Sequence, residues 1–130
     1  MVHPDTVMNA ECGVRNAELQ ELTKRFALEV IALSEEVMMS RVAEVIMRQL
    51  IRSATSVGAN YRAACRAKSR ADFIAKMGIV EEEADESRYW IELLLESDRI
   101  AQSRAEQFFE QCDAILAMTV ASIRTARGQR

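Results

Sequence analysis

Apolar residues recur every three or four positions along most of the chain, the spacing that places side chains on one face of an α-helix. The first such pattern covers residues 17–38 and the second covers residues 41–66. The apolar positions of the first are Leu19, Leu22, Phe26, Val30, Leu33 and Val37. Those of the second are Ala43, Ile46, Leu50, Ala54, Val57, Tyr61 and Ala64. Since only a few residues around Ser40 separate the two patterns, we expect neighbouring antiparallel helices.

Two further helices are predicted over residues 70–97 and 104–126. Ser69 precedes the third, where its hydroxyl can cap the first free amides, and Asp72 then lies in the first turn. Ser103 and Glu106 match a capping box at the start of the fourth. The seam of the third helix is Phe73, Met77, Val80, Ala84, Ser87, Ile91 and Leu94. The seam of the fourth is Ala105, Phe108, Cys112, Ile115, Thr119 and Ser122.

Four amphipathic helices joined by short loops pack most simply as an antiparallel up-down four-helix bundle. The composition agrees with an all-α fold, since the 130 residues include only 4 glycines and 1 proline. We therefore predict one domain over residues 16–127, preceded by a flexible N-terminal tail over residues 1–15.

The charge and the cysteines restrict the classes of function. A net charge of −3 argues against indiscriminate binding to nucleic acid, so any such site must be local. The three cysteines, Cys12, Cys65 and Cys112, are far apart and form no CxxC pair, which argues against disulfides and zinc. Residues 1–15 lack the features of a signal peptide, and no apolar run approaches the ~20 residues of a membrane span. We expect a cytoplasmic protein without a membrane partner.

Arginines form a basic face on the helix predicted over residues 41–66. Arg48, Arg52, Arg62 and Arg66, together with Arg41, fall within roughly 80° of arc at the 100° turn per residue of a helix. One interpretation is a site for RNA phosphates or another partner, because arginine binds phosphate in a bidentate manner. The other, which the pattern favours, is ion pairing with acidic residues of the third helix. Those acidic residues are Glu82, Asp85, Glu92 and Glu96.

A polar stripe accompanies the apolar one on the same helix. Gln49, Ser53, Ser56 and Asn60 follow one another at steps of 4, 3 and 4 residues. The stripe is either a recognition groove or, as we prefer, a buried hydrogen-bond network that fixes the register with Glu83 or Lys76 of the third helix.

No catalytic or metal-binding set is visible. The carboxylates between Glu81 and Glu86 invite comparison with metal-binding bundles, which need Glu-x-x-His motifs, but the single histidine is His3. The same lack of histidine removes a base for a serine or cysteine nucleophile. We therefore expect no enzyme activity, no cofactor, no metal and no small-molecule substrate.

Several apolar residues lie off the internal seams, and self-association is the simplest explanation for them. They are Ala27, Ile31, Ile79, Leu93 and Leu95. Trp90 lies beside the seam residue Ile91, which is typical of an anchor in the core or between protomers.

Four segments of the chain carry a family resemblance. They are Arg48-Gln49-Leu50, Arg52 to Asn60, Ser69 to Ile74 with Lys76, and Glu83 to Glu86 followed by Tyr89 to Leu94. With them the chain resembles the four helix bundle protein family, also called the 23S rRNA-intervening sequence protein family, which some genomes encode within large-subunit ribosomal RNA genes. The resemblance extends to accessory proteins of diversity-generating retroelements. Ala63 departs from the pattern, which has glutamate there.

The resemblance implies a ring-like homopentamer and a partner that is RNA or a ribonucleoprotein. We therefore expect a non-enzymatic oligomeric scaffold that docks RNA on Arg48, Arg52, Arg62 and Arg66. The alternative is a protein-protein interaction adaptor with no role in nucleic-acid binding.

Overall fold

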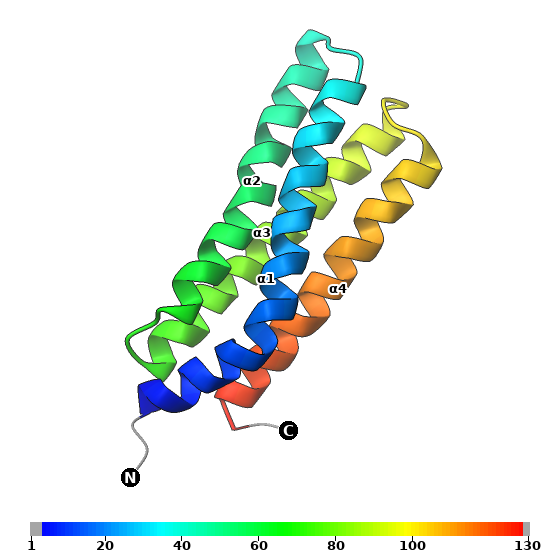
Figure 1. Cartoon of the computed structure of the whole chain (residues 1–130). Coiled ribbons are helices and arrows are strands. Elements are labelled where there is room, and N and C mark those ends of the chain that lie inside the picture. The colour runs from blue at the N-terminus through cyan, green and yellow to red at the C-terminus, as the bar shows by residue number, and fades with distance from the viewer. Residues whose placement is uncertain (1–3, 129–130) are drawn as a thin grey trace.

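The chain folds as a bundle of four helices, and consecutive helices run in opposite directions (Figure 1). The computed structural model describes the backbone of residues 4–128 and the side chains of residues 17–128. The helices are α1 (Pro4–Glu36), α2 (Arg41–Cys65), α3 (Arg70–Glu96) and α4 (Gln102–Ala126). The start of α1 and the end of α4 lie at the same end of the bundle. The predicted fold class is confirmed: the chain is all-α, with no strand between residues 4 and 128.

The first helix is longer than the apolar pattern predicts. It begins at Pro4 rather than near residue 17, so residues 4–15, predicted as a tail, have a helical backbone. Proline is favoured at the first position of a helix because its missing amide hydrogen would have no partner there. The side chains of His3 and Cys12 lie outside the described residues.

Serine hydroxyls begin two of the helices. The Ser69 hydroxyl accepts a hydrogen bond from the Asp72 amide at 3.0 Å, which confirms the predicted cap of α3. Ser40 does the same for α2, with a bond from the Ala43 amide at 3.1 Å that the sequence pattern did not reveal. The Asp72 carboxylate accepts bonds from the Lys76 ammonium and the Lys68 amide, and these bonds lower the pKa of its carboxyl group.

The predicted capping box of α4 is wrong. The helix begins at Gln102, its N-cap is Ala101, and no side chain caps it, so Ser103 lies inside the first turn. The preceding turn is short. Asp98 adopts a φ of 60°, and the amide of Arg99 donates to the carbonyl of Leu94 at 2.8 Å, which closes α3 with a Schellman motif. Three residues later, α4 begins at Gln102, before the serine.

The core lies along the bundle axis and follows the predicted seams closely. All seven seam residues predicted for α3 are buried, and no other residue of that helix is. On α4 the prediction fails at its end, because Ile123 is buried in place of Ser122. On α1, Leu22 is half-buried and Thr23 takes the core position beside it. Phe26 and Phe108, both 0% exposed, meet edge to face at 6.2 Å and join α1 to α4.

Ion pairs tie the outer edges of the helices together. Arg88 of α3 binds Asp113 of α4 at 2.7 Å, and its guanidinium lies 4.5 Å from the ring centroid of Phe109. Arg104 of α4 binds Glu36 of α1 at 3.2 Å. These contacts fix α4 against both of its neighbours.

Candidate nucleic-acid interface on helix α2

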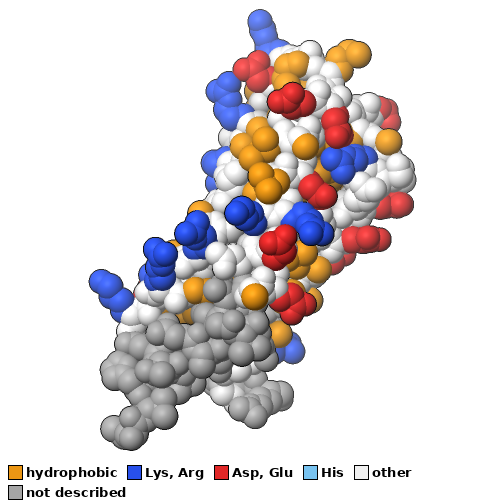
Figure 2. Space-filling view, viewed as in Figure 1, with side chains coloured by type: hydrophobic (Ala, Val, Ile, Leu, Met, Phe, Trp, Pro, Cys, Tyr) orange, Lys and Arg blue, Asp and Glu red, His pale blue; other side chains and the backbone are white. Residues whose placement is uncertain are grey.

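Helix α2 presents three different faces to its surroundings. Its apolar face is buried, its polar stripe borders α3, and its arginines point outward. Figure 2 shows the Lys and Arg side chains following the α2 edge of the molecule, while Asp and Glu lie mostly toward the other side. We call the residues Arg41, Arg48, Arg52, Arg62 and Arg66 the arginine ridge; all five are exposed.

Among residues 17–128, Arg52 is the one residue of the ridge that binds another helix. Its guanidinium forms an ion pair with Glu83 of α3 at 3.3 Å and a second one with Glu86. It also donates from Nε to the Oε1 atom of Gln49 at 3.2 Å. Arg52 therefore neutralises two carboxylates at the boundary of α2 and α3, and its charge is largely committed to the fold.

The other four arginines are left available on the surface. Arg48 pairs only with Glu44, one turn earlier on its own helix, at 2.9 Å. Within residues 17–128, Arg41, Arg62 and Arg66 have no carboxylate partner. An exposed pair within one helix contributes only about 0.3–0.5 kcal/mol, so Arg48 can exchange its partner at little cost.

The acidic residues predicted to pair with the ridge do not do so. Glu92 instead binds Arg88 of its own helix at 3.5 Å, while Glu82, Asp85 and Glu96 are exposed and form no ion pair with the described residues. The side of α3 that faces α2 carries Glu83, Glu86 and Ser87, so the predicted stripe lies too far around the helix. Among residues 17–128, Arg52 is the member of the ridge that pairs with α3, and its partners are carboxylates other than the predicted ones.

This difference predicts unequal effects on stability. Arg52→Ala leaves Glu83 and Glu86 facing each other without a cation, and we expect the free energy of unfolding to fall by about 1–2 kcal/mol. Arg48→Ala removes the same side chain from an exposed pair and should cost less than about 0.5 kcal/mol. Urea denaturation of both variants measures the difference, and equal losses would mean that Arg52 does not hold the two helices together.

The polar stripe borders α3, but only part of it bonds across the boundary. Ser53 is fully buried; its hydroxyl accepts a hydrogen bond from the Ser87 hydroxyl of α3 at 2.8 Å and donates to the Leu50 carbonyl. Asn60 donates instead to the Ser56 hydroxyl at 2.8 Å, within its own helix. Of the partners predicted for the stripe, Glu83 binds Arg52, as described above. Lys76 binds Asp72, four residues earlier on α3, at 2.7 Å.

The described part of the chain offers little support for a metal site, a reactive cysteine or a membrane-spanning helix. No group of three or more His, Cys, Asp or Glu side chains there is arranged to hold a metal ion. Cys112 is buried, and this burial raises the pKa of its thiol to about 12, so the reactive thiolate does not form near neutral pH. No helix between residues 4 and 128 combines the length and apolar character needed to cross a bilayer.

Sequence reasoning missed two residues that bear on this surface. Glu86 was not predicted as a partner of Arg52, although its spacing of three from Glu83 places both on one side of α3. Lys24 of α1 was missed because its proximity to Arg62 of α2 depends on how the two helices pack; both line one groove.

Fold and surface together define a small helical-bundle protein whose most distinctive surface is a basic ridge on one helix. A family model described as 23S rRNA-intervening sequence protein matches residues 15–121, and the chain belongs to this family. The chain is also similar to a crystal structure of a protein with unknown function from the S23 ribosomal protein family of Bacteroides thetaiotaomicron. The two are 33% identical with a TM-score of 0.77, and the match covers 82% of this chain and 98% of that one. Among curated proteins, none matches the chain.

Proposed function

We propose that the protein is a non-enzymatic, oligomeric scaffold that binds RNA or a ribonucleoprotein through the arginine ridge of α2. The observation that carries the proposal is that Arg41, Arg62 and Arg66 point outward without a carboxylate partner among residues 17–128 of a chain whose net charge is −3. Guanidinium groups bind phosphate oxygens in a bidentate geometry, and an RNA backbone offers them in series. The family description, with its reference to 23S rRNA, supports the same partner. We also propose that the protein is located in the cytoplasm, together with the RNA that it binds.

Self-association would give the arginine ridge an affinity for RNA that a single acidic protomer lacks. Several ridges held in one assembly bind a single RNA with a high effective concentration, so weak contacts add up. The family resemblance implies five copies in a ring, and exposed apolar side chains support an assembly. These exposed side chains are Leu28, Ile31, Met38, Met39, Val42, Val45, Ile79 and Tyr89. Of the off-seam residues predicted from the sequence, Ile31 and Ile79 are exposed, whereas Ala27, Leu93 and Leu95 are half-buried.

The first turn of α2 offers the clearest test of assembly. Val42 and Val45 are 52% and 60% exposed, one turn apart at the start of the helix. We expect wild-type protein to sediment as an oligomer at micromolar concentration and the double substitution Val42→Glu, Val45→Glu to sediment as a monomer, because burying a charge in an interface is unfavourable. The fold should survive, since neither side chain is in the core.

An unchanged helix content by circular dichroism, with cooperative unfolding, is the control for this variant. If the wild-type protein is itself a monomer across the micromolar range, the oligomeric part of the proposal is wrong. If the variant stays assembled, the assembly uses another surface.

Fluorescence anisotropy with a labelled single-stranded RNA of about 20 nucleotides tests the proposed partner. We expect micromolar binding at about 50 mM salt by the assembled protein and weaker binding by the monomeric variant, because avidity is lost. Absence of binding by the oligomer at this salt concentration would favour the alternative function, a protein-interaction adaptor whose charges serve solubility.

A further inference from the structure

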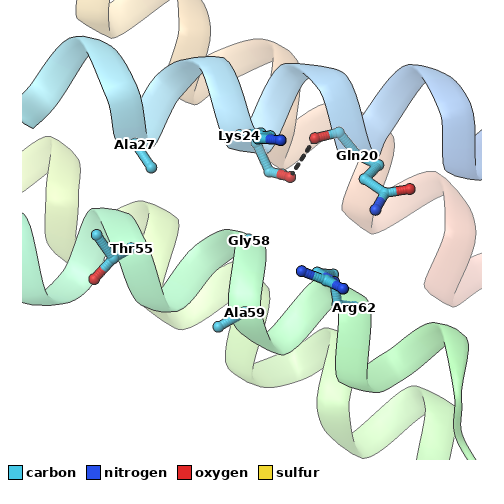
Figure 3. Close-up of a pocket in the computed structure, with 8 residues that line it drawn as sticks. Gln20, Lys24, Ala27, Thr55, Gly58, Ala59 and Arg62 are labelled. Atoms are coloured by element: carbon cyan, nitrogen blue, oxygen red, sulfur yellow. Dashed lines mark hydrogen bonds between the residues drawn. The ribbon is translucent and has the colours of Figure 1, made fainter.

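A groove lies between α1 and α2, beside the arginine ridge. It encloses about 270 Å³ and is lined from both helices (Figure 3). One water molecule takes up about 30 Å³ of the liquid, so the groove has room for a small ion with part of its hydration shell. In Figure 3, Lys24 lies on the α1 side, Arg62 rises from α2 toward α1, and Gln20 lies opposite Arg62.

The groove is positively charged and has no carboxylate in its lining. Lys24 and Arg62 form no ion pair with any residue between 17 and 128. Arg25, the residue after Lys24, binds Glu21 at 3.6 Å in an exposed pair on α1. The lining hydroxyl of Thr23 donates to the carbonyl of Gln20 at 3.1 Å, so its hydrogen is already used. Lys24 and Arg62 are therefore the groups in the lining with charge to offer, and their complement is an anion.

Gly58 of α2 lines the groove. It lies against Thr23, and a Cβ atom placed on it would come within 3.5 Å of the Thr23 hydroxyl oxygen. Without that Cβ atom the α2 backbone itself forms part of the floor. Ala59, the next residue, is exposed and lies at the rim, so the opening toward solvent is bordered by a methyl group.

We propose that this groove binds a phosphate group, with Lys24 and Arg62 as the two cations that hold it. Arg62 belongs to both the arginine ridge and the groove. The bound phosphate is then one phosphate of an RNA backbone that runs along α2, and this part of the inference rests on the proposed function. Arg62 supplies a planar, bidentate contact and Lys24 a mobile point charge, a combination suited to a tetrahedral oxyanion. The groove would thereby set where along the ridge the RNA backbone lies.

Inorganic phosphate is the first probe, because it tests the groove without RNA. In an NMR titration of the whole protein we expect the amide signals of Gly58 and Ala59 to shift with a dissociation constant on the order of millimolar. Lys24→Gln should weaken this binding by about fivefold or more. Arg25→Gln is the matched control, since it removes one charge from the adjacent residue, outside the groove, and should leave the titration unchanged. Ala59→Leu fills the rim without changing any charge and should also weaken binding.

RNA is the second probe, and it separates this inference from the proposed function. The inference predicts that Lys24→Gln weakens RNA binding by about fivefold or more while Arg25→Gln does not. If RNA binds and the two variants behave alike, the groove is not a phosphate site although the ridge binds RNA. If phosphate shifts Gly58 but RNA does not bind, the groove stands and the proposed function falls. If phosphate leaves the amide signals of Gly58 and Ala59 unshifted, the proposal is overturned.

Discussion

Replacing Phe108 by alanine lowers the free energy of unfolding by about 3–5 kcal/mol, the cost of removing a large ring from a closed core. Phe108 is 0% exposed and packs edge to face on Phe26, so its loss opens a cavity between α4 and α1. The substitution also removes the ring over which the Arg104 guanidinium lies at 4.7 Å. Urea or thermal denaturation of the variant measures the loss.

Phe109→Ala is the matched control for this effect. It removes the same ring from the next residue, which is half-buried and lies under Arg88 at the α3–α4 edge. Because less apolar area is lost from the interior, we expect a loss of about 1–2 kcal/mol. Similar losses for the two variants would mean that the core does not centre on the contact between Phe26 and Phe108.

Substituting Arg48, Arg62 and Arg66 by glutamine reduces RNA affinity about a hundredfold at low salt while leaving the fold intact. None of the three arginines binds another helix among the described residues, so the structure gives no reason for a large loss of stability. Each removed cation that neutralised a phosphate of a single strand lowers the salt dependence by roughly 0.7, so the slope of log K against log salt should become shallower by about 2. Anisotropy titrations measure both quantities.

The control must remove the same charge from elsewhere on the molecule. Glutamine at Arg25, Arg99 and Arg124 does so on α1, on the turn after α3 and on α4. A general electrostatic attraction would be weakened equally by both triple variants. A site on α2 would be weakened by the first alone. If both triple variants lose the same RNA affinity, RNA does not bind specifically at the arginine ridge, even if the wild-type protein binds it.

The sequence predicts the core well where the apolar repeat is strict. On α3 the alternating steps of four and three residues run from Phe73 to Leu94, and every predicted position is buried. On α4 the same rule predicts Ser122, whereas Ile123 is buried. A straight helix has 3.6 residues per turn, so its core side drifts away from a seven-residue repeat over several turns, and the choice between neighbours falls to the larger apolar side chain.

Ion-pair partners were harder to predict than the core. The arginine face and the acidic stripe are both visible as spacings, but spacing does not say which side of each helix meets the other. Long side chains such as Arg52 reach carboxylates at the helix boundary, and here these belong to Glu83 and Glu86. The groove lined by Lys24 and Arg62 could not be predicted from the sequence either, because it depends on how α1 packs on α2.

A salt titration of RNA binding by the assembled wild-type protein tests the arginine ridge most directly. Three ridge arginines, Arg41, Arg62 and Arg66, have no carboxylate partner among residues 17–128, and Arg48 is only weakly paired. If all four bind phosphates of a single strand, log K falls linearly with log salt with a slope of about −3 per engaged protomer. We predict such a slope, with binding detectable at about 50 mM salt. A slope near zero, or no binding at that salt concentration, would contradict RNA binding by the ridge.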